Sequence, residues 1–355
     1  MFNLVTQEHG MVRETVHRLF KDLRATDTEM RQRDGSRIAS AAVGSALAEL
    51  GIYETDGTET FMVSAQVQAI VALEAGASAL PFPVTESLAA HATLAKTDKL
   101  AEVEAGHFMT LSTASPELSE LPVYVADKLT GTGQLVSYSQ VTGRALIEAC
   151  QASSRVALTV DLNGAGVRRC RRTSVEGEYL LDDLEFDHVP AHPLGGSGTT
   201  ELDVSEFLGQ RLAILAAAEI AGACRSMVEM TQEYLLTRSQ FGQVLGANQV
   251  LKHALADNLV RVEAMSASIE YAAAALDAGA QDAAAAAAAA KLFAGRAGKL
   301  VADSSLQMHG AIGYTAEYQL HLLMRRVYRL AASFGSSLVQ SDRLFEMFKQ
   351  GSSND

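Results

Sequence analysis

Two short segments in the C-terminal part of the chain carry side chains and turns suited to holding a phosphate group. The first, residues 238–242, reads RSQFG, and the second, residues 307–317, reads QMHGAIGYTAE. Arg238 offers a planar set of N–H donors that matches phosphate oxygens. Gly242 and Gly310 permit close approach of the backbone to a ligand, and helix N-termini beside such turns add a favourable dipole. The two segments together therefore have the groups that a phosphate-bearing ligand would need.

In order and separation, the two segments resemble the flavin-binding signatures of the acyl-CoA dehydrogenase family, R-x-Q-F-G and Q-x-x-G-(G/A)-x-G-(Y/F)-x-x-E. Singly, an arginine at a helix end is usually a solvated cap and a glycine-rich turn only a turn, so the assignment rests on the pair. The resemblance implies an FAD whose adenosine and pyrophosphate half contacts these loops, while its flavin ring sits on the neighbouring subunit. The residues assigned to this contact are Arg238, Gln240, Phe241, Gln249, Gln307, Gly310 and Ala311.

The same resemblance locates the positions of the catalytic base, and neither of them holds a carboxylate. The family removes the substrate's α-proton with a glutamate of raised pKa, placed near the end of the chain or, in some relatives, on an earlier helix. These positions are occupied here by Phe334 and Gln210. Because neither side chain can take up a proton, we expect no catalytic residue in this chain.

The loop that would hold the flavin ring also departs from the family. In active relatives a T-E-P-x-A-G-S-D segment of the β domain hydrogen-bonds the ring, usually with a tryptophan packed on it. The corresponding residues here, 108–120, read FMTLSTASPELSE, and the chain contains no tryptophan. We therefore expect this chain's own flavin-ring pocket to be degraded.

The chain therefore keeps the adenosine and pyrophosphate half of an FAD site and lacks the flavin-ring half and the base. This asymmetry is explained if the chain pairs with a different subunit that supplies the missing half. The chain resembles the base-less subunit of heteromeric (α2β2) acyl-CoA dehydrogenases from bacteria that degrade steroids. This resemblance implies a catalytic acyl-CoA dehydrogenase subunit as the partner, which supplies the base, the flavin-ring pocket and most of the acyl-CoA site. It also implies that the assembled enzyme catalyses the α,β-dehydrogenation of an acyl-CoA thioester, with a steroid side-chain CoA ester among the substrates. The implied electron acceptor is an electron-transfer flavoprotein.

Two other interpretations stay open at this point. The first is a self-sufficient homomeric acyl-CoA dehydrogenase with an unrecognised base, for which Glu317, Glu206 and Asp203 are the candidates. The second is a non-enzymatic scaffold or binding protein on the same fold, including the family's DNA-associated members. The acidic charge of the chain argues against the DNA-binding version.

Helical patterns lie on both sides of a short β region. Apolar residues recur at helical spacing, or long Ala- and Leu-rich stretches occur, in residues 8–21, 38–50, 63–76, 85–95, 204–236, 250–278, 283–306 and 318–348. Between them, β-branched runs separated by turns predict strands at residues 108–111, 122–127, 134–141, 155–162, 166–172 and 178–189, with a hairpin signal at Asn163-Gly164. We expect a mainly α protein with a small β domain and an acyl-CoA dehydrogenase-like fold. Its expected parts are an N-terminal helical domain (1–106), a middle β domain (107–198) and a C-terminal four-helix bundle with the FAD-contact loops (199–355).

Composition limits the class of protein. The chain has 355 residues, of which 48% are hydrophobic and 20% charged, as in globular proteins. A net charge of -13 argues against nucleic acid as a main partner. No apolar run approaches the length of a membrane-spanning helix and no signal peptide is visible, so we expect a cytoplasmic protein with no membrane contact. Cys150, Cys170 and Cys224 are far apart and odd in number, which predicts buried thiols and neither disulfides nor a zinc site.

Overall fold

The computed structural model describes most of the chain, in two compact units that are interleaved in the sequence. The described residues are 6–34, 38–53, 61–97, 110–111, 121–152, 154–177, 179–194, 201–240 and 242–352. One unit, mainly helical, comprises Met1–Arg24, Ala69–Ala79 and Ala213–Asp355; the other, which holds the β-sheet, comprises Ala25–Gln68 and Leu80–Leu212. The predicted domain limits at 106 and 198 lie outside the described residues and stay predictions.

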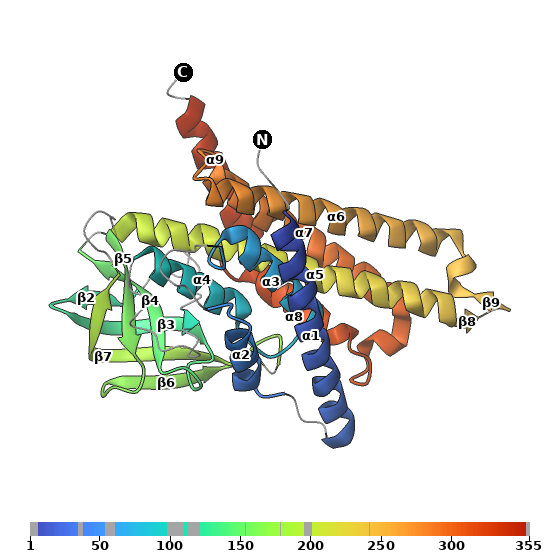
Figure 1. Cartoon of the computed structure of the whole chain (residues 1–355), viewed down its shortest axis with the longest axis horizontal. Coiled ribbons are helices and arrows are strands. Elements are labelled where there is room, and N and C mark those ends of the chain that lie inside the picture. Colours follow the sequence, from blue (N-terminus) through green and yellow to red (C-terminus); the bar gives the residue numbers. More distant parts are fainter. Residues whose placement is uncertain are drawn as a thin grey trace. The chain divides into compact units, whose positions relative to one another are not determined.

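Helices form nearly everywhere that apolar spacing predicts them (Figure 1). They are α1 (Gln7–Asp34), α2 (Ser40–Glu49), α3 (Ala65–Ser78), α4 (Val84–Lys96), α5 (Glu201–Thr237), α6 (Gln249–Asp277), α7 (Ala283–His309), α8 (Leu320–Ala332) and α9 (Ser337–Ser352), with short 3₁₀ helices η2 (Leu245–Ala247) and η3 (Gly310–Tyr314). The expected single helix at 318–348 is wrong, because the chain breaks between α8 and α9. Phe334 and Gly335 there have φ of 57° and 88°, a left-handed conformation that an α-helix cannot contain.

Helix α5 packs against α3 and α7 so closely that three contact positions require glycine. A Cβ added to Gly76 of α3 would lie 1.9 Å from the carbonyl oxygen of Glu219, and one added to Gly222 of α5 would lie 1.8 Å from that of Leu73. At Gly298 of α7 an added Cβ would lie 2.6 Å from the Cγ2 atom of Ile220. Any side chain at these positions would push the helices apart.

A buried ion cluster joins α5 to α8 in the same region. The carboxylate of Glu219 lies 3.3 Å from Arg326 Nη1 and 3.9 Å from Arg329 Nη2. Arg326 also donates to the carbonyl oxygen of Ala75 in α3, at 3.4 Å. Because Glu219 and Arg326 are each only 1% exposed, removing one partner would leave a buried charge uncompensated. The cluster therefore holds α3, α5 and α8 in one arrangement.

Helix α5 is unusually apolar for its length. Among the described residues, Val204–Thr237 is long and apolar enough to cross a membrane by length and composition, although Glu206, Arg211 and Glu219 interrupt its apolar run. However, 78% of its most apolar window is buried inside the protein. A helix whose apolar surface is already covered by protein is a core helix, as the packing of α3 and α7 on it shows.

The other unit contains a seven-stranded sheet with the order β1-β4-β2-β3-β7-β5, in which β6 also pairs with β7. Its strands are β1 (Thr110–Leu111), β2 (Val123–Val125), β3 (Lys128–Ser137), β4 (Arg144–Gln151), β5 (Ser154–Asp161), β6 (Val167–Arg172) and β7 (Leu181–Pro193). Because β4 and β5 pair as well, β4, β2, β3, β7 and β5 form a closed ring. The side chains that point inward form one apolar cluster that includes Leu129, Ile147, Leu158 and Phe186.

Three details of the sheet differ from the sequence prediction. Strand β4 was not predicted, because its residues have only modest strand preference; antiparallel pairing with β5 along its whole length stabilises it. The tight turn between β2 and β3 uses Ala126 and Asp127, with φ of 49° and 59°, and no glycine. Asn163-Gly164 does not close a hairpin between neighbours, since β5 pairs with β4 and β7, whereas β6 pairs with β7.

The expectation of three buried thiols is only partly correct. All three cysteines are free, and Cys224 on α5 is buried, but Cys150 and Cys170 are half-buried. Both half-buried residues lie on strands of the sheet, where one face of the strand is partly open to solvent. Complete burial raises the pKa of the Cys224 thiol, so this cysteine is a packing residue in the helical unit.

A buried lysine holds the break between α8 and α9. The Nζ atom of Lys291, on α7, donates to the carbonyl oxygens of Leu330 at 2.9 Å and Gly335 at 3.2 Å. Burial, with a smaller contribution from the positive charge of Lys299, lowers the pKa of Lys291 from 10.5 to about 7. The Lys291 amine therefore stabilises the break, and because it is buried, its protonation costs free energy.

We predict that Gly222→Ala lowers the free energy of unfolding by about 2 kcal/mol or more, because its Cβ would collide with the backbone of α3. Urea unfolding followed by circular dichroism measures this. Gly209→Ala, in the same helix, is the matched control: an added Cβ meets nothing within 4 Å, so we expect a gain of up to about 1 kcal/mol from helix propensity. Equal stability of the two variants would contradict the close packing of α3 on α5.

We also predict that Lys291 makes stability rise with pH. Its pKa of about 7 in the folded state is lower than the 10.5 of an unperturbed lysine, so the unfolded chain binds more protons between these values. Stability should therefore increase from about pH 7 towards 10, by up to about 1.4 kcal/mol per pH unit. Urea titrations at pH 7.5 and 9.0 should show a smaller increase for Lys291→Met than for the wild type. The same increase in both proteins would show that Lys291 is not the cause.

Candidate functional site

The first predicted loop is a tight hairpin between α5 and α6. Its strands β8 (Ser239–Gln240) and β9 (Gln243–Val244) pair antiparallel, and the turn places Gly242 at a φ of 79°. The backbone N–H of Leu245 donates to the carbonyl oxygen of Arg238 at 2.8 Å, which closes the loop. The side chains of Arg238, Gln240 and Gln249 are exposed, whereas Phe241 lies outside the described residues.

The second predicted loop begins where α7 ends. Gly310 terminates the helix with a φ of 64°, and η3 follows. Gln307, Gly310 and Ala311 are all exposed. The residues assigned to cofactor contact on this loop therefore face solvent in the single chain, like those on the first loop.

His309, in the last turn of α7, has a structural role that the motif does not reveal. It is 4% exposed, and its Nδ1–H donates to the carbonyl oxygen of Ser305 at 2.8 Å. Its Nε2 lies 3.1 Å from the hydroxyl of Tyr318, which therefore donates to it. Burial lowers the pKa of the His309 imidazole, so the neutral ring is favoured. A neutral, fully bonded histidine fixes the end of α7.

Aromatic packing brings the two loops to the same end of the helical unit. The ring of Tyr234, one helical turn before Arg238, stacks on His309 with centroids 4.7 Å apart and an interplanar angle of 25°. Tyr318 completes the cluster, edge-on to Tyr234 at 6.4 Å. Figure 1 shows β8 and β9 at the far end of α5 and α6. The sequence does not reveal this cluster, because its three members come from separate segments.

The exposed donors fit the phosphate-bearing half of a dinucleotide. Within the described part of the chain, the Arg238 guanidinium has no side-chain partner, so its N–H donors are available. An added Cβ at Gly242 or Gly310 would meet nothing within 4 Å, so the backbone at both turns is open to a ligand. Nearby amides of Gln240, Gln249 and Gln307 add donors and acceptors suited to ribose hydroxyls. Guanidinium, amides and open glycine turns are the chemistry that a pyrophosphate and a ribose require.

The two positions expected to carry the base do not hold one. Phe334 is 8% exposed, and its carbonyl oxygen accepts a hydrogen bond from Gln340 Nε2 at 3.1 Å. Gln210 is half-buried, and its amide donates to Glu206 at 3.1 Å. Both positions therefore serve local packing and hydrogen bonding.

Two of the three alternative carboxylates lie at the surface of the described part of the chain. Glu317 and Glu206 are both exposed to solvent. Asp203 lies in α5, but its side chain is outside the described residues. Of the segment expected to face the flavin ring, Thr110–Leu111 form β1 beside β4, and the rest lies outside the described residues. The degraded ring pocket therefore stays a prediction.

Comparison with known sequences connects the helical unit with one family. Residues 201–347 match the family model "Acyl-CoA dehydrogenase, C-terminal domain". Acyl-CoA dehydrogenase IpdE2 of Mycolicibacterium smegmatis is 34% identical over 146 residues, which are 41% of this chain and 45% of that protein. The matched segments span less than half the length of each of three such curated relatives: 45%, 25% and 35%.

Solved structures show the same fold over nearly the whole chain. The Tcur3481-Tcur3483 steroid ACAD G363A variant has a TM-score of 0.87 at 22% identity, over 98% of this chain and 99% of that chain. The ChsE4-ChsE5 complex from Mycobacterium tuberculosis has a TM-score of 0.84 at 20% identity, over 97% and 98%. Glutaryl-CoA dehydrogenase from Mycobacterium smegmatis in complex with FADH2 has a TM-score of 0.82 at 15% identity, over 97% and 95%.

These findings agree with the two loop motifs. At such low identities the structural likeness shows the fold alone, and it confirms the expected fold class. The match of residues 201–347 covers both predicted loops, helices α5 to α8 and most of α9. Residues 201–347 are therefore similar to the C-terminal domain of acyl-CoA dehydrogenases, and the chain as a whole has the acyl-CoA dehydrogenase fold.

Proposed function

We propose that this chain is the non-catalytic subunit of a flavin-dependent acyl-CoA dehydrogenase, and that it contributes the adenosine and pyrophosphate half of a shared FAD site. The observation that carries the proposal is an asymmetry within the chain. Available donors of Arg238 and the two open glycine turns lie at one end of the helical unit, whereas Phe334 and Gln210 occupy the base positions. A catalytic partner subunit in an α2β2 assembly supplies the base and the flavin-ring pocket.

Each residue of the two loops has a defined task in this proposal. The Arg238 guanidinium donates to pyrophosphate oxygens, and the exposed amides of Gln240, Gln249 and Gln307 bond ribose or phosphate oxygens. The backbone at Gly310 and Ala311 lies against the phosphates, and Phe241 is assigned the contact with the adenine or the flavin edge. When bound, FAD supplies the acceptor for the hydride that leaves the β-carbon of the acyl-CoA. This chain holds the cofactor, and the partner abstracts the α-proton.

The substrate class follows from the partner and from the relatives. We propose an acyl-CoA thioester with a bulky group such as a steroid side chain, bound mainly by the partner. Support comes from the fold neighbours, one named as a steroid ACAD and another as a complex of two differently named proteins. An electron-transfer flavoprotein is the proposed acceptor of the electrons.

We predict that Arg238→Ala lowers the FAD content of the complex of this chain with its catalytic partner. Losing a charged hydrogen bond to phosphate costs about 1.5–3 kcal/mol, so FAD should bind roughly tenfold or more weakly. Flavin absorbance per complex after gel filtration measures this. Arg18→Ala removes the same charge from an exposed position on α1 and should leave FAD content unchanged. Full occupancy in Arg238→Ala would contradict the assignment of the pyrophosphate contact.

A further inference from the structure

A cavity of about 460 Å³ opens within the helical unit, away from the two loops in sequence, and its lining comes from α1, α3 and α5. One face of α1 supplies Arg13, His17, Lys21 and Arg24, at the spacing of successive helical turns. Helix α3 adds Glu74, and α5 adds Arg225. The volume lies in the range of small-molecule sites.

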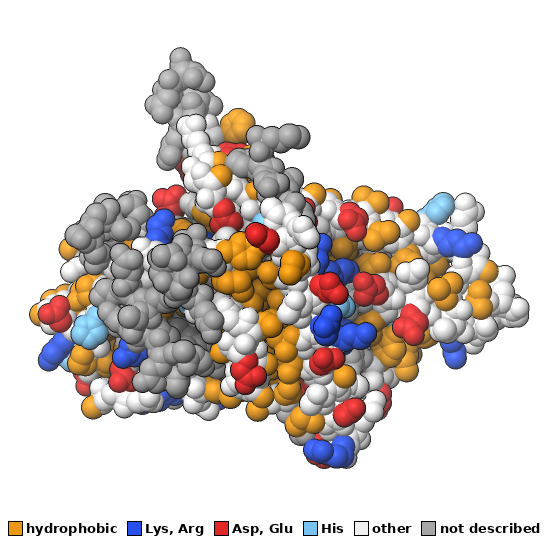
Figure 2. Space-filling view, in the orientation of Figure 1, with side chains coloured by type: hydrophobic (Ala, Val, Ile, Leu, Met, Phe, Trp, Pro, Cys, Tyr) orange, Lys and Arg blue, Asp and Glu red, His pale blue; other side chains and the backbone are white. Residues whose placement is uncertain are grey.

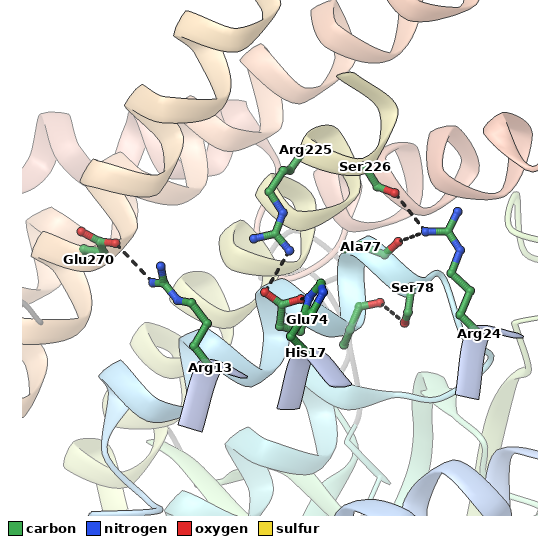
Figure 3. A network of polar contacts seen from close by, with 10 residues as sticks. Arg13, His17, Arg24, Glu74, Ala77, Ser78, Arg225, Ser226 and Glu270 are labelled. Atoms are coloured by element: carbon green, nitrogen blue, oxygen red, sulfur yellow. Dashed lines mark hydrogen bonds and ion pairs between the residues drawn. The ribbon is translucent and has the colours of Figure 1, made fainter. Parts of the chain in front are cut away.

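A buried carboxylate organises the centre of this cavity, as Figure 3 shows. The side chain of Glu74 is 4% exposed; its Oε2 accepts from His17 Nδ1–H at 2.8 Å and its Oε1 from Arg225 Nη2 at 2.9 Å. One residue from each of three helices thus meets at this point. The contact fixes Arg225, whose guanidinium would otherwise be mobile, while using only one of its nitrogens.

Arg24 is a second fixed cation at the wall. Its Nη1 donates to the carbonyl oxygen of Ala77 at 3.0 Å and to Ser226 Oγ at 3.1 Å, and its Nη2 donates to Gln319 Oε1 at 3.1 Å. Burial lowers the pKa of Arg24, which reflects the cost of keeping this charge out of water. Its donors are occupied, so it acts on the cavity through its charge.

Two cationic groups keep donors for a ligand. Within the described part of the chain, the Lys21 ammonium has no side-chain partner, and Arg225 donates to Glu74 alone. Two of the three acidic residues in the lining have partners of their own: Glu14 is 3.5 Å from Arg18, and Glu74 is bonded as described. Arg13 is likewise 3.7 Å from Glu270, which lies outside the lining. The charged lining residues that remain are Lys21, Arg24 and Arg225 against Glu74 and Glu229, which leaves the cavity positive in a chain whose net charge is -13. Figure 2 shows this mixture of charges on the face that carries α1.

We propose that this cavity binds a small phosphate ester, with its phosphate between Lys21 and Arg225. An ammonium and a guanidinium from different helices suit a tetrahedral oxyanion, which accepts hydrogen bonds from several directions. A planar carboxylate is better matched by a single bidentate arginine, and here one face of Arg225 is already taken by Glu74. Phe20 and Ala77 give the cavity an apolar wall for the organic part of the ligand.

The test is phosphate binding by the full chain, measured by isothermal titration calorimetry in phosphate-free buffer at low ionic strength. The probes are inorganic phosphate and adenosine 5′-monophosphate. Lys21→Gln should bind both probes roughly tenfold or more weakly, since it loses a charged contact. Lys128→Gln, which removes the same charge from an exposed position on β3, should bind like the wild type.

Arg238→Ala separates this site from the proposed FAD contact. We expect it to keep the phosphate affinity of the wild type, whether or not it loses FAD. Stronger binding of the adenosine ester than of free phosphate would show that the apolar wall contacts the organic group, and equal binding would make free phosphate the ligand. No binding of either probe, equal affinity in Lys21→Gln and wild type, or a loss confined to Arg238→Ala would overturn the proposal.

Discussion

Helix α5 approaches α3 and α7 at distances that only glycine allows, and the positions of both proposed sites depend on this packing. Gly76 and Gly222 let the backbones of α3 and α5 touch, while Gly298 brings α7 against Ile220. With the three helices in fixed register, the ends of α5 and α7 meet, and Tyr234 can stack on His309. The same register places Glu74 of α3 beside Arg225 of α5 and so builds the centre of the cavity.

The proposed role depends on which parts of an FAD site these packed helices and their loops can supply. A pyrophosphate needs a cation and open backbone turns, and these are present at exposed positions around Arg238, Gly242 and Gly310. Proton abstraction needs a carboxylate shielded from water, but Phe334 and Gln210 stand where the family places it. In the proposed function, this chain therefore holds part of the cofactor, and a second, different subunit carries out the chemistry.

Much of this arrangement could be predicted from the sequence. Long apolar repeats identified the helices, and the spacing of Arg238 and Gln307 within two motifs located both loops. The break at Phe334 could not be predicted, because a phenylalanine at positive φ carries no local signal and is held by hydrogen bonds from Lys291 and Gln340 to neighbouring carbonyl groups. Strand β4 depends on its partner β5, and the lining of the cavity comes from three distant segments. Tertiary contacts decide each of these features.

The most direct test of the account is to purify this chain alone and together with a catalytic acyl-CoA dehydrogenase subunit, and to measure flavin absorbance and solution mass in both cases. The account predicts a colourless or unstable lone chain and a yellow heterotetramer in which each pair of subunits shares one FAD. A yellow homo-oligomer that carries one FAD in every chain would contradict it, because such a chain would have a complete flavin site of its own.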